Sequence, residues 1–259
     1  MKVCVLASSS AGNSVFVGTE RTRVLIDAGI SRREIFKRLA AIGEDAGRLT
    51  AILVTHEHSD HTSGLPAMAK ARAAEKCLPV YVTHGTAAFI DWGDCHAQIE
   101  RFQAGCSFSI GDLEISSFTI PHDAVDPVGF TLTADGVKVA IVTDLGYIPD
   151  SLRVHLRGTH LLILESNHDL EMLRVGPYPW SIKQRVMSRK GHLSNEVAAE
   201  FIERDLDTCV STVVLAHISE QNNHPELVRS AGLKALNGRS LFTRLVVSPP
   251  GVQSEVFCY

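Results

Sequence analysis

Residues 51–61 read AILVTHEHSDH, and this stretch carries the strongest structural signal in the chain. Its first half is an apolar run that predicts a buried strand. Side chains two apart on an extended backbone point the same way, so His56 and His58 can face one ion. Asp60 and His61 follow where the chain turns toward a helix, so they can face a second ion. Imidazole and carboxylate are ligands for zinc or manganese, so the stretch favours a site for two divalent ions over a solvated histidine cluster.

Six residues cannot fill two coordination spheres, so further ligands must come from elsewhere in the chain. Three other ligand-type residues stand, like His56, directly after apolar runs that predict strands. They are His122 after Phe118-Thr119-Ile120, Asp144 after Val139-Ala140-Ile141-Val142-Thr143, and His217 after Val213-Val214-Leu215-Ala216. Each alone is more often an ordinary hydrogen-bonded loop residue. The repeated arrangement favours ligation by all three.

Short apolar runs alternate with helical patterns along the rest of the chain. The expected strands are 3–7, 14–18, 22–27, 51–55, 79–83, 113–120, 137–143, 160–165, 211–217 and 243–248, and the expected helices are 31–42, 65–76, 178–189, 194–205 and 224–236. Asp135-Gly136 is typical of a hairpin turn, and Ser194 makes half a capping box. Two groups of strands, each with its own helices, predict an α/β fold: an αββα sandwich of two facing mixed sheets with helices on both outer faces. Because no repeat or linker is visible, we expect a single domain over residues 1–259.

Composition is that of an ordinary globular protein, with 45% hydrophobic and 21% charged residues. The chain shows no secretory pattern, no apolar stretch long enough for a membrane span and no C-x-x-C pair among its six cysteines. These features predict reduced thiols, a cytoplasmic location and no membrane partner.

The net charge of −4 argues against a protein that coats nucleic acid through a basic surface. Residues 172–192 nevertheless contain no carboxylate, and their basic residues are Arg174, Lys183, Arg185, Arg189 and Lys190. This segment suits a local groove for a nucleic-acid backbone, and a solvated helix face explains it nearly as well.

A resemblance to the metallo-β-lactamase superfamily rests on the order and rough spacing of residues 56–61, His122, Thr143-Asp144 and Leu215-Ala216-His217. The resemblance implies that the first metal is held by His56, His58 and His122, the second by Asp60, His61 and His217, and that Asp144 bridges the two. The Asp-His end of the first motif, without a cysteine ligand, resembles the dinuclear RNase Z and glyoxalase II branches rather than the lactamases that destroy antibiotics.

Four further strings resemble, in the same order, the YycJ/VicX-type family, also called WalJ. They are Ser8-Ser9-Ser10-Ala11-Gly12-Asn13-Ser14, Leu164-Glu165-Ser166-Asn167-His168-Asp169, Gly191-His192-Leu193-Ser194-Asn195 and Ala216-His217-Ile218-Ser219-Glu220-Gln221-Asn222-Asn223. Members of that family are regarded as 5′-to-3′ exonucleases on DNA. The resemblance therefore implies a dinuclear metal-dependent phosphodiesterase with nucleic acid, DNA more than RNA, as its substrate. The Glu165 and His192 strings also resemble elements of RNase Z, where the motif histidine assists phosphodiester cleavage, and we carry that role to His192.

A hydroxide held between two metal ions is the expected nucleophile, because the ions lower the pKa of water toward about 7. Asp60 can orient this hydroxide with its spare oxygen, and His192 is the candidate general acid for the departing 3′-oxygen. The candidate substrate contacts are Ser9, Ser10, Asn13, His168, Lys183 and Arg185. Asp123 and Glu165 are candidates to orient the ligand imidazoles.

Several of these interpretations have alternatives. Residues 8–14 suit either a phosphate-binding nest of backbone N–H groups or a plain hairpin loop. His168 is either a substrate contact or a partner of a metal ligand. The metal motif alone also suits another dinuclear hydrolase, acting on a thioester, a lactone or a small cyclic phosphodiester. A non-catalytic partner of a two-component regulatory system is the rival from another class, and the full ligand set together with His192 argues against it.

Overall fold

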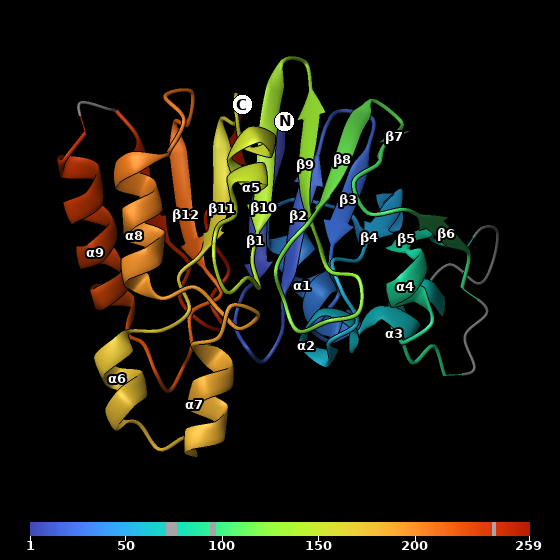
Figure 1. Ribbon diagram of the computed structural model, residues 1–259. Coiled ribbons are helices and arrows are strands. Elements are labelled where there is room, and N and C mark those ends of the chain that lie inside the picture. The colour runs from blue at the N-terminus through green and yellow to red at the C-terminus, as the bar shows by residue number, and fades with distance from the viewer. Residues whose placement is uncertain (71–76, 94–96, 240–241) are drawn as a thin grey trace.

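The computed structural model describes residues 1–70, 77–93, 97–239 and 242–259. Within these residues the strands form two seven-stranded sheets (Figure 1). The order is β14-β1-β2-β3-β4-β5-β6 in the first sheet and β13-β12-β11-β10-β9-β8-β7 in the second. Each sheet contains antiparallel and parallel pairs, such as β1 with β2 and β3 with β4 in the first, and β9 with β10 and β10 with β11 in the second. Both sheets are therefore mixed, as the sequence predicted.

The first sheet consists of β14 (Phe257–Cys258), β1 (Lys2–Ala7), β2 (Ser14–Gly18), β3 (Arg23–Ile26), β4 (Ala51–Leu53), β5 (Val80–Thr83) and β6 (Ile99–Phe102). The second consists of β13 (Arg244–Val247), β12 (Thr212–Ala216), β11 (Leu161–Glu165), β10 (Val137–Val142), β9 (Val128–Ala134), β8 (Leu113–Thr119) and β7 (Ser107–Ile110). The helices are α1 (Arg32–Ala41), α2 (Ser59–Thr62), α3 (Leu65–Ala69), α4 (His84–Ala87), α5 (Asp150–His155), α6 (Leu170–Val175), α7 (Trp180–Val186), α8 (Asn195–Arg204) and α9 (Pro225–Asn237), with a 3₁₀ turn at Ala46–Arg48.

Strand β1 shows how the sandwich is packed. Val3 and Val5 belong to the apolar core between the two sheets, whereas Cys4 and Leu6 belong to the core on the outer face. Successive side chains of a strand point to opposite faces, so a strand covered on both sides is apolar at every position. This double burial explains why the strands appear in the sequence as continuous apolar runs.

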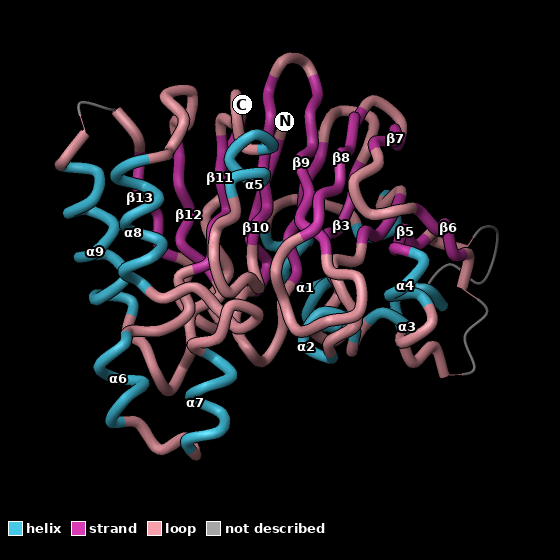
Figure 2. The backbone as a smooth tube through the Cα atoms, viewed as in Figure 1, coloured by secondary structure: helices cyan, strands magenta, loops and turns pink. Residues whose placement is uncertain are grey.

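Helices cover both outer faces, as Figure 2 shows. On the first sheet, α1 packs through Ile35 and Leu39. On the second sheet, α8 and α9 pack through Phe201, Ile202 and Val228. These layers confirm the αββα sandwich, because the two helical layers and the two sheets each bury one apolar face against the next layer.

The structure also departs from the expected elements. Strands β6, β7, β9 and β14 and the short helices α4 and α5 were missed. The sequences of β6 and β7, IERF and SFSI, are half polar and lie at sheet edges. In β9, VGFTLTA, a glycine and two threonines interrupt the apolar run, and β14 has only two residues. The expected helix 178–189 is only Trp180–Val186, and α6 precedes it as an additional short helix. In Figure 1, α6 and α7 project beyond the ends of the strands. The expected helix 65–76 begins as α3 at Leu65, and its last residues, 71–76, lie outside the described residues.

Two smaller predictions are confirmed. Asp135-Gly136 forms a two-residue hairpin turn, with Ala134 paired to Val137 and φ of 50° and 77° at the turn residues. Ser194 caps α8 by accepting a hydrogen bond from the Val197 amide.

No helix of the described residues has both the length and the apolar character to cross a lipid bilayer. Cys4 is a buried free thiol, and Cys209 and Cys258 are exposed free thiols. Cys95 lies outside the described residues.

Candidate metal centre

The candidate ligands follow strands, in loops except for Asp60 and His61, which lie on α2. These strand ends form the lower edge of both sheets in Figure 1. Three residues at these strand ends have left-handed backbone conformations: Asp27 with φ 61°, Asp144 with φ 63° and His217 with φ 55°. Positive φ is uncommon for residues other than glycine, and such strained positions cluster at functional sites. The backbone strain at the sheet edge is thus concentrated around one group of side chains.

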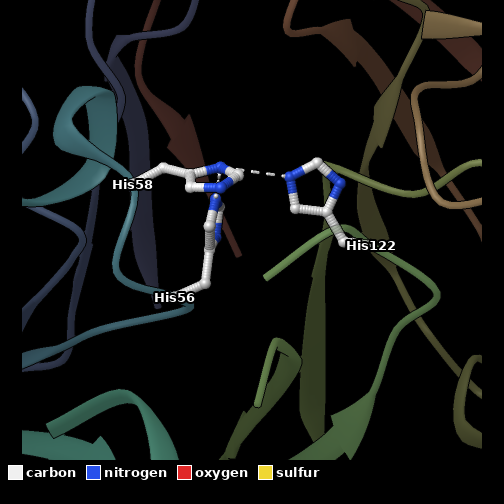
Figure 3. A group of neighbouring side chains, drawn as sticks. All are labelled: His56, His58 and His122. Carbon is white, nitrogen blue, oxygen red and sulfur yellow. Dashed lines mark hydrogen bonds between the residues drawn. The ribbon is translucent and has the colours of Figure 1, made fainter. Parts of the chain in front are cut away.

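Three imidazoles converge in the first cluster (Figure 3). Nδ1 of His58 lies 3.1 Å from Nε2 of His56 and 3.3 Å from Nε2 of His122. Tetrahedral zinc with Zn–N bonds of about 2.0–2.1 Å separates its ligand nitrogens by about 3.3 Å. The spacing of the three nitrogens therefore fits a shared ion.

A second cluster consists of Asp60, His61 and His217, with Asp144 between it and the first. Nε2 of His61 lies 3.4 Å from Oδ2 of Asp60 and 3.4 Å from Oδ2 of Asp144. Nε2 of His217 lies 3.4 Å from Oδ1 of Asp144, which is also 4.0 Å from Nε2 of His122 in the first cluster. One carboxylate thus reaches ligand atoms of both clusters.

Two atoms in this arrangement are buried without a hydrogen-bond partner in the described part of the chain: Oδ2 of Asp144 and Nε2 of His217. An unsatisfied buried polar atom costs about 1–3 kcal/mol, so such atoms in a native protein need an explanation. Both atoms face the other ligand-type groups, and imidazole with carboxylate is a donor set that divalent transition metals prefer. The clusters therefore fit divalent metal binding.

The electrostatics of the cluster agree with this fit. Burial opposes ionisation of Asp144, but the imidazoles of His217 and His61 hold its pKa well below the usual range. Burial lowers the pKa of His56 and His122, so these imidazoles are neutral, as metal ligands must be. Burial would also lower the pKa of His217, yet nearby carboxylates, Asp144 first, raise it to about 10. A cation that binds His217 must therefore displace a proton.

In three of the candidate ligands, His61, His122 and His217, the ring nitrogen that points away from the clusters contacts a group outside them. Nδ1 of His61 lies 2.7 Å from Oδ2 of Asp27, and Nδ1 of His122 lies 3.2 Å from the Gly191 carbonyl oxygen. Oε1 of Glu165 lies 2.8 Å from Nδ1 of His217 and 2.8 Å from Nδ1 of His192. These contacts orient Nε2 of His61, His122 and His217 toward the cluster.

Glu165 therefore lies where the sequence placed it, beside a ligand imidazole. Its other oxygen accepts hydrogen bonds from the Leu145 and Leu193 amides. Because its oxygens are occupied on the outer side of the imidazoles, Glu165 serves the ligands and is not itself a ligand.

Sequence reasoning missed Asp27. Its carboxylate binds His61 and also accepts hydrogen bonds from the amide and hydroxyl of Thr55. The signal was present, because Asp27 ends the expected strand 22–27 as Asp144 ends its own apolar run. Its place directly after an apolar run is the same feature that identified His122, Asp144 and His217.

Asp27→Asn is expected to lower metal affinity about 10- to 100-fold, the usual effect of losing a partner of a ligand histidine. The amide nitrogen would donate to Nδ1 of His61, which places the ring proton on Nε2 and blocks that atom as a ligand. Titration with zinc or manganese followed by calorimetry measures the change. Asp45→Asn, at an exposed cap, is the matched control. An unchanged affinity would exclude this role for Asp27.

A cavity of about 280 Å³ opens on the two clusters. It is lined by Ser10, His58, Ser59, Asp60, His122, Asp123, Asp144, Ile182, Arg185, Val186, Gly191, His192 and His217. Four proposed functional residues outside the metal set, Ser10, Asp123, Arg185 and His192, thus share one space with the candidate ligands. Glu165 holds Nδ1 of His192, which leaves Nε2 as the nitrogen available to the cavity.

Of the two interpretations of the serine-rich loop, the structure favours the hairpin loop, between the antiparallel strands β1 and β2, over the phosphate-binding nest. Ser9 and Asn13 are buried and do not line the cavity. The amides of Ala11, Gly12 and Asn13 already donate to Ser9 Oγ, Ser9 O and Asp60 O. Asn13 also binds Oδ2 of Asp60 at 3.2 Å. Because these groups are satisfied within the protein, Ser9 and Asn13 are corrected from substrate contacts: Ser9 holds the loop, and Asn13 supports Asp60. Of the three residues, Ser10 lines the cavity.

Lys183 and Asp123 also differ from their expected roles, because each contacts another group of the protein. Lys183 is buried, and its Nζ donates to the Arg174 carbonyl oxygen at 2.7 Å, so its charge is not available to a strand. Asp123 does not hold the outer nitrogen of His122; Oδ1 lies 3.4 Å from the inward Nε2, and Oδ2 accepts from Arg185. Asp123 is therefore a residue of the cavity wall.

His168 fits neither of its two expected roles. It is buried away from the cavity lining, and among the described residues its Nδ1 has no hydrogen-bond partner. Burial lowers its pKa to about 4, so the ring is neutral. The backbone of His168 pairs with Ser194 and accepts from the Asn195 amide. Through these two backbone contacts, His168 holds the segment that follows His192.

Comparison with known proteins agrees with this arrangement. The family model described as "Beta-lactamase superfamily domain" matches residues 22–218. Exodeoxyribonuclease YycJ of Bacillus anthracis is 37% identical over 233 residues, which cover 87% of this chain and 85% of the relative. Exodeoxyribonuclease WalJ of Streptococcus pneumoniae is 37% identical over 231 residues, 87% of this chain and 84% of the relative.

Among solved structures, the metallo-β-lactamase fold protein YhfI of Bacillus subtilis superposes with a TM-score of 0.73 at 18% identity, over 98% of this chain and 99% of YhfI. The fold, the family model and the two relatives agree on the family of this chain. The chain belongs to the β-lactamase superfamily and, within it, to the family that includes the proteins named exodeoxyribonuclease YycJ and WalJ.

Proposed function

We propose that this protein is a metal-dependent exodeoxyribonuclease that degrades DNA from the 5′ end. The observation that carries the proposal is the clustering of seven ligand-type side chains, five of which line one cavity, in a chain 37% identical to named exodeoxyribonucleases. An enzyme whose site had lost its function would not be expected to keep every ligand together with His192 beside them.

Two divalent ions, zinc or manganese, are proposed to occupy the two clusters. His56, His58 and His122 would hold the first ion, and Asp60, His61 and His217 the second, with Asp144 as ligand to both. Ions in these positions supply activation of water at neutral pH and neutralise charge on the phosphoryl oxygens.

The protein's own residues then orient the attacking water and protonate the leaving group. Asp60 is partly exposed in the cavity and can accept a hydrogen bond from the attacking water. Burial lowers the pKa of His192, but the Glu165 carboxylate raises it above the ordinary value for histidine. The Glu165 carboxylate thus favours the protonated ring, and Nε2 of His192 can give a proton to the departing 3′-oxygen. Glu165 keeps that ring oriented throughout.

Arg185 is the proposed phosphate contact within the cavity. Asp123 holds its guanidinium over the site, and its side chain is 60% exposed. Arg185→Gln is expected to lower kcat/KM on DNA about tenfold, because one charge-assisted hydrogen bond is lost. Metal content should stay at the wild-type value. Arg157→Gln, exposed on a distant loop, is the control. Unchanged kcat/KM on DNA would remove Arg185 from the site.

The proposal is tested with purified protein on single- and double-stranded DNA labelled at either end, on RNA, and on bis-p-nitrophenyl phosphate, with and without chelator. We expect mononucleotide release from the 5′ end of DNA, loss of activity with chelator, and recovery with zinc or manganese. Hydrolysis of the small ester without any cleavage of DNA would favour a different dinuclear hydrolase. Inactivity on every substrate at full metal occupancy would favour a regulatory partner.

A further inference from the structure

Two loops that carry site residues are packed against each other beside the cavity. One continues from Asp144 to Tyr147, and the other runs from Ser188 to His192. A Cβ at Gly146 would lie only 2.3 Å from the Arg189 carbonyl carbon and 2.4 Å from the Ser188 oxygen. Glycine is therefore required where the backbones meet, and the relative position of the two loops is fixed.

This contact brings together an aromatic ring and a cation. The guanidinium carbon of Arg189 lies 4.1 Å from the centroid of the Tyr147 ring. Tyr147 is three residues from Asp144, and Arg189 is two residues from Gly191, which lines the cavity. At about 3.3–3.6 Å per residue, the Cα atom of Arg189 lies within about 7 Å of the Cα atom of Gly191.

Arg189 differs from three of the other basic residues of its segment, and from the exposed Lys190 in lying over an aromatic ring. Arg174 pairs with Glu171, Arg185 pairs with Asp123, and the ammonium of Lys183 is buried against a carbonyl oxygen. Across the described ranges of the chain, no carboxylate forms an ion pair with Arg189, and its side chain is exposed. Its charge is therefore held in place without being neutralised.

A guanidinium stacked on a ring exposes its donors at the edge of the stack. These donors match the geometry of a phosphate, and stacking removes much of the side-chain freedom that binding would otherwise cost. An acidic peptide would meet the same cation, but the adjoining hydrolytic cavity favours a strand with phosphates at regular intervals.

We propose that Arg189, held by Tyr147, is a subsite for a second phosphate of the nucleic-acid strand, next to the phosphate that is cleaved. This inference rests on the proposed nuclease function. The subsite makes the enzyme prefer substrates with at least two phosphodiester groups over single esters.

The test measures kcat/KM of the metal-loaded enzyme on bis-p-nitrophenyl phosphate and on single-stranded oligodeoxynucleotides of two to eight nucleotides, at several salt concentrations. Wild type should show a step in kcat/KM when the substrate gains its second phosphodiester. Arg189→Ala should lose about tenfold on the longer substrates, with little change on the single ester. The slope of log kcat/KM against log salt should fall by about 0.7, the value for one phosphate contact on a single strand.

Companion variants separate charge from stacking. Arg189→Lys should keep the salt slope but lose part of the step, because it retains the charge without the planar fork. Tyr147→Phe should behave as wild type, whereas Tyr147→Leu should resemble Arg189→Lys. Arg157→Ala, an exposed arginine on another loop, controls for a general loss of positive charge.

Two results would overturn the subsite alone: wild-type length dependence and salt slope in Arg189→Ala, or equal losses on the ester and the oligonucleotides. A wild-type enzyme that hydrolyses the ester but cleaves no oligonucleotide would overturn the nuclease function and the subsite together.

Discussion

Replacing Asp144 by alanine is expected to remove bound metal and to abolish hydrolysis of every substrate. Asp144 lies between the two clusters, with Oδ1 3.4 Å from Nε2 of His217 and Oδ2 3.4 Å from Nε2 of His61. If one carboxylate neutralises part of the charge of both ions, alanine leaves two dications beside each other without that charge. The affinity of both sites should therefore fall together, and not only that of one.

Metal content by mass spectrometry, measured alongside turnover on bis-p-nitrophenyl phosphate, tests this expectation. Asp150→Ala is the matched control, because Asp150 is an exposed aspartate at the start of α5. Thermal unfolding of both variants shows whether the fold is retained. The bridging role is refuted by a variant that keeps two metals per chain and near wild-type turnover.

Replacing His192 by asparagine is expected to lower kcat about 10²- to 10⁴-fold with metal content unchanged, the range for a general acid. The asparagine amide occupies roughly the position of Nδ1, so it can still donate to Glu165, which also holds His217. The variant therefore removes Nε2 from the cavity while sparing the partner of a metal ligand. Alanine would not make this distinction, because it leaves Glu165 short of one donor.

The control is His84→Asn, at an exposed histidine on α4. A fall in metal content in His192→Asn would make His192 a ligand, and wild-type turnover would exclude it from proton transfer. A substrate with a better leaving group provides a second readout. The loss should shrink on p-nitrophenyl esters, because p-nitrophenolate departs with little need of a proton.

Local pattern in the sequence was sufficient for the fold and for the set of candidate ligands. Most strands buried on both faces are continuous apolar runs, and such runs are visible without knowing what they pair with, whereas the buried strand β9 contains a glycine and two threonines and was missed. The end of a strand is equally local, so His122, Asp144 and His217 were identified from their place after apolar runs. Edge strands such as β6 and β7 lack that pattern, because one side of them faces solvent.

Only the tertiary structure decided what the supporting residues touch. Asp27 reaches His61, Glu165 joins His217 to His192, and Gly146 admits Arg189. Each of these contacts joins residues 27 to 52 positions apart, whereas periodicity along the sequence reports on neighbours within a few positions.

The residues whose expected roles the structure corrects also show that sequence pattern does not report tertiary contacts. Ser9, Asn13 and Lys183 have side chains of the type that binds phosphate, and the structure uses them for hydrogen bonds within the protein. A buried polar group must find a partner, and whether that partner is substrate or protein depends on which surfaces meet. The sequence by itself determined which residues carry the chemistry at the strand ends; folding determined which polar side chains remain available to a substrate.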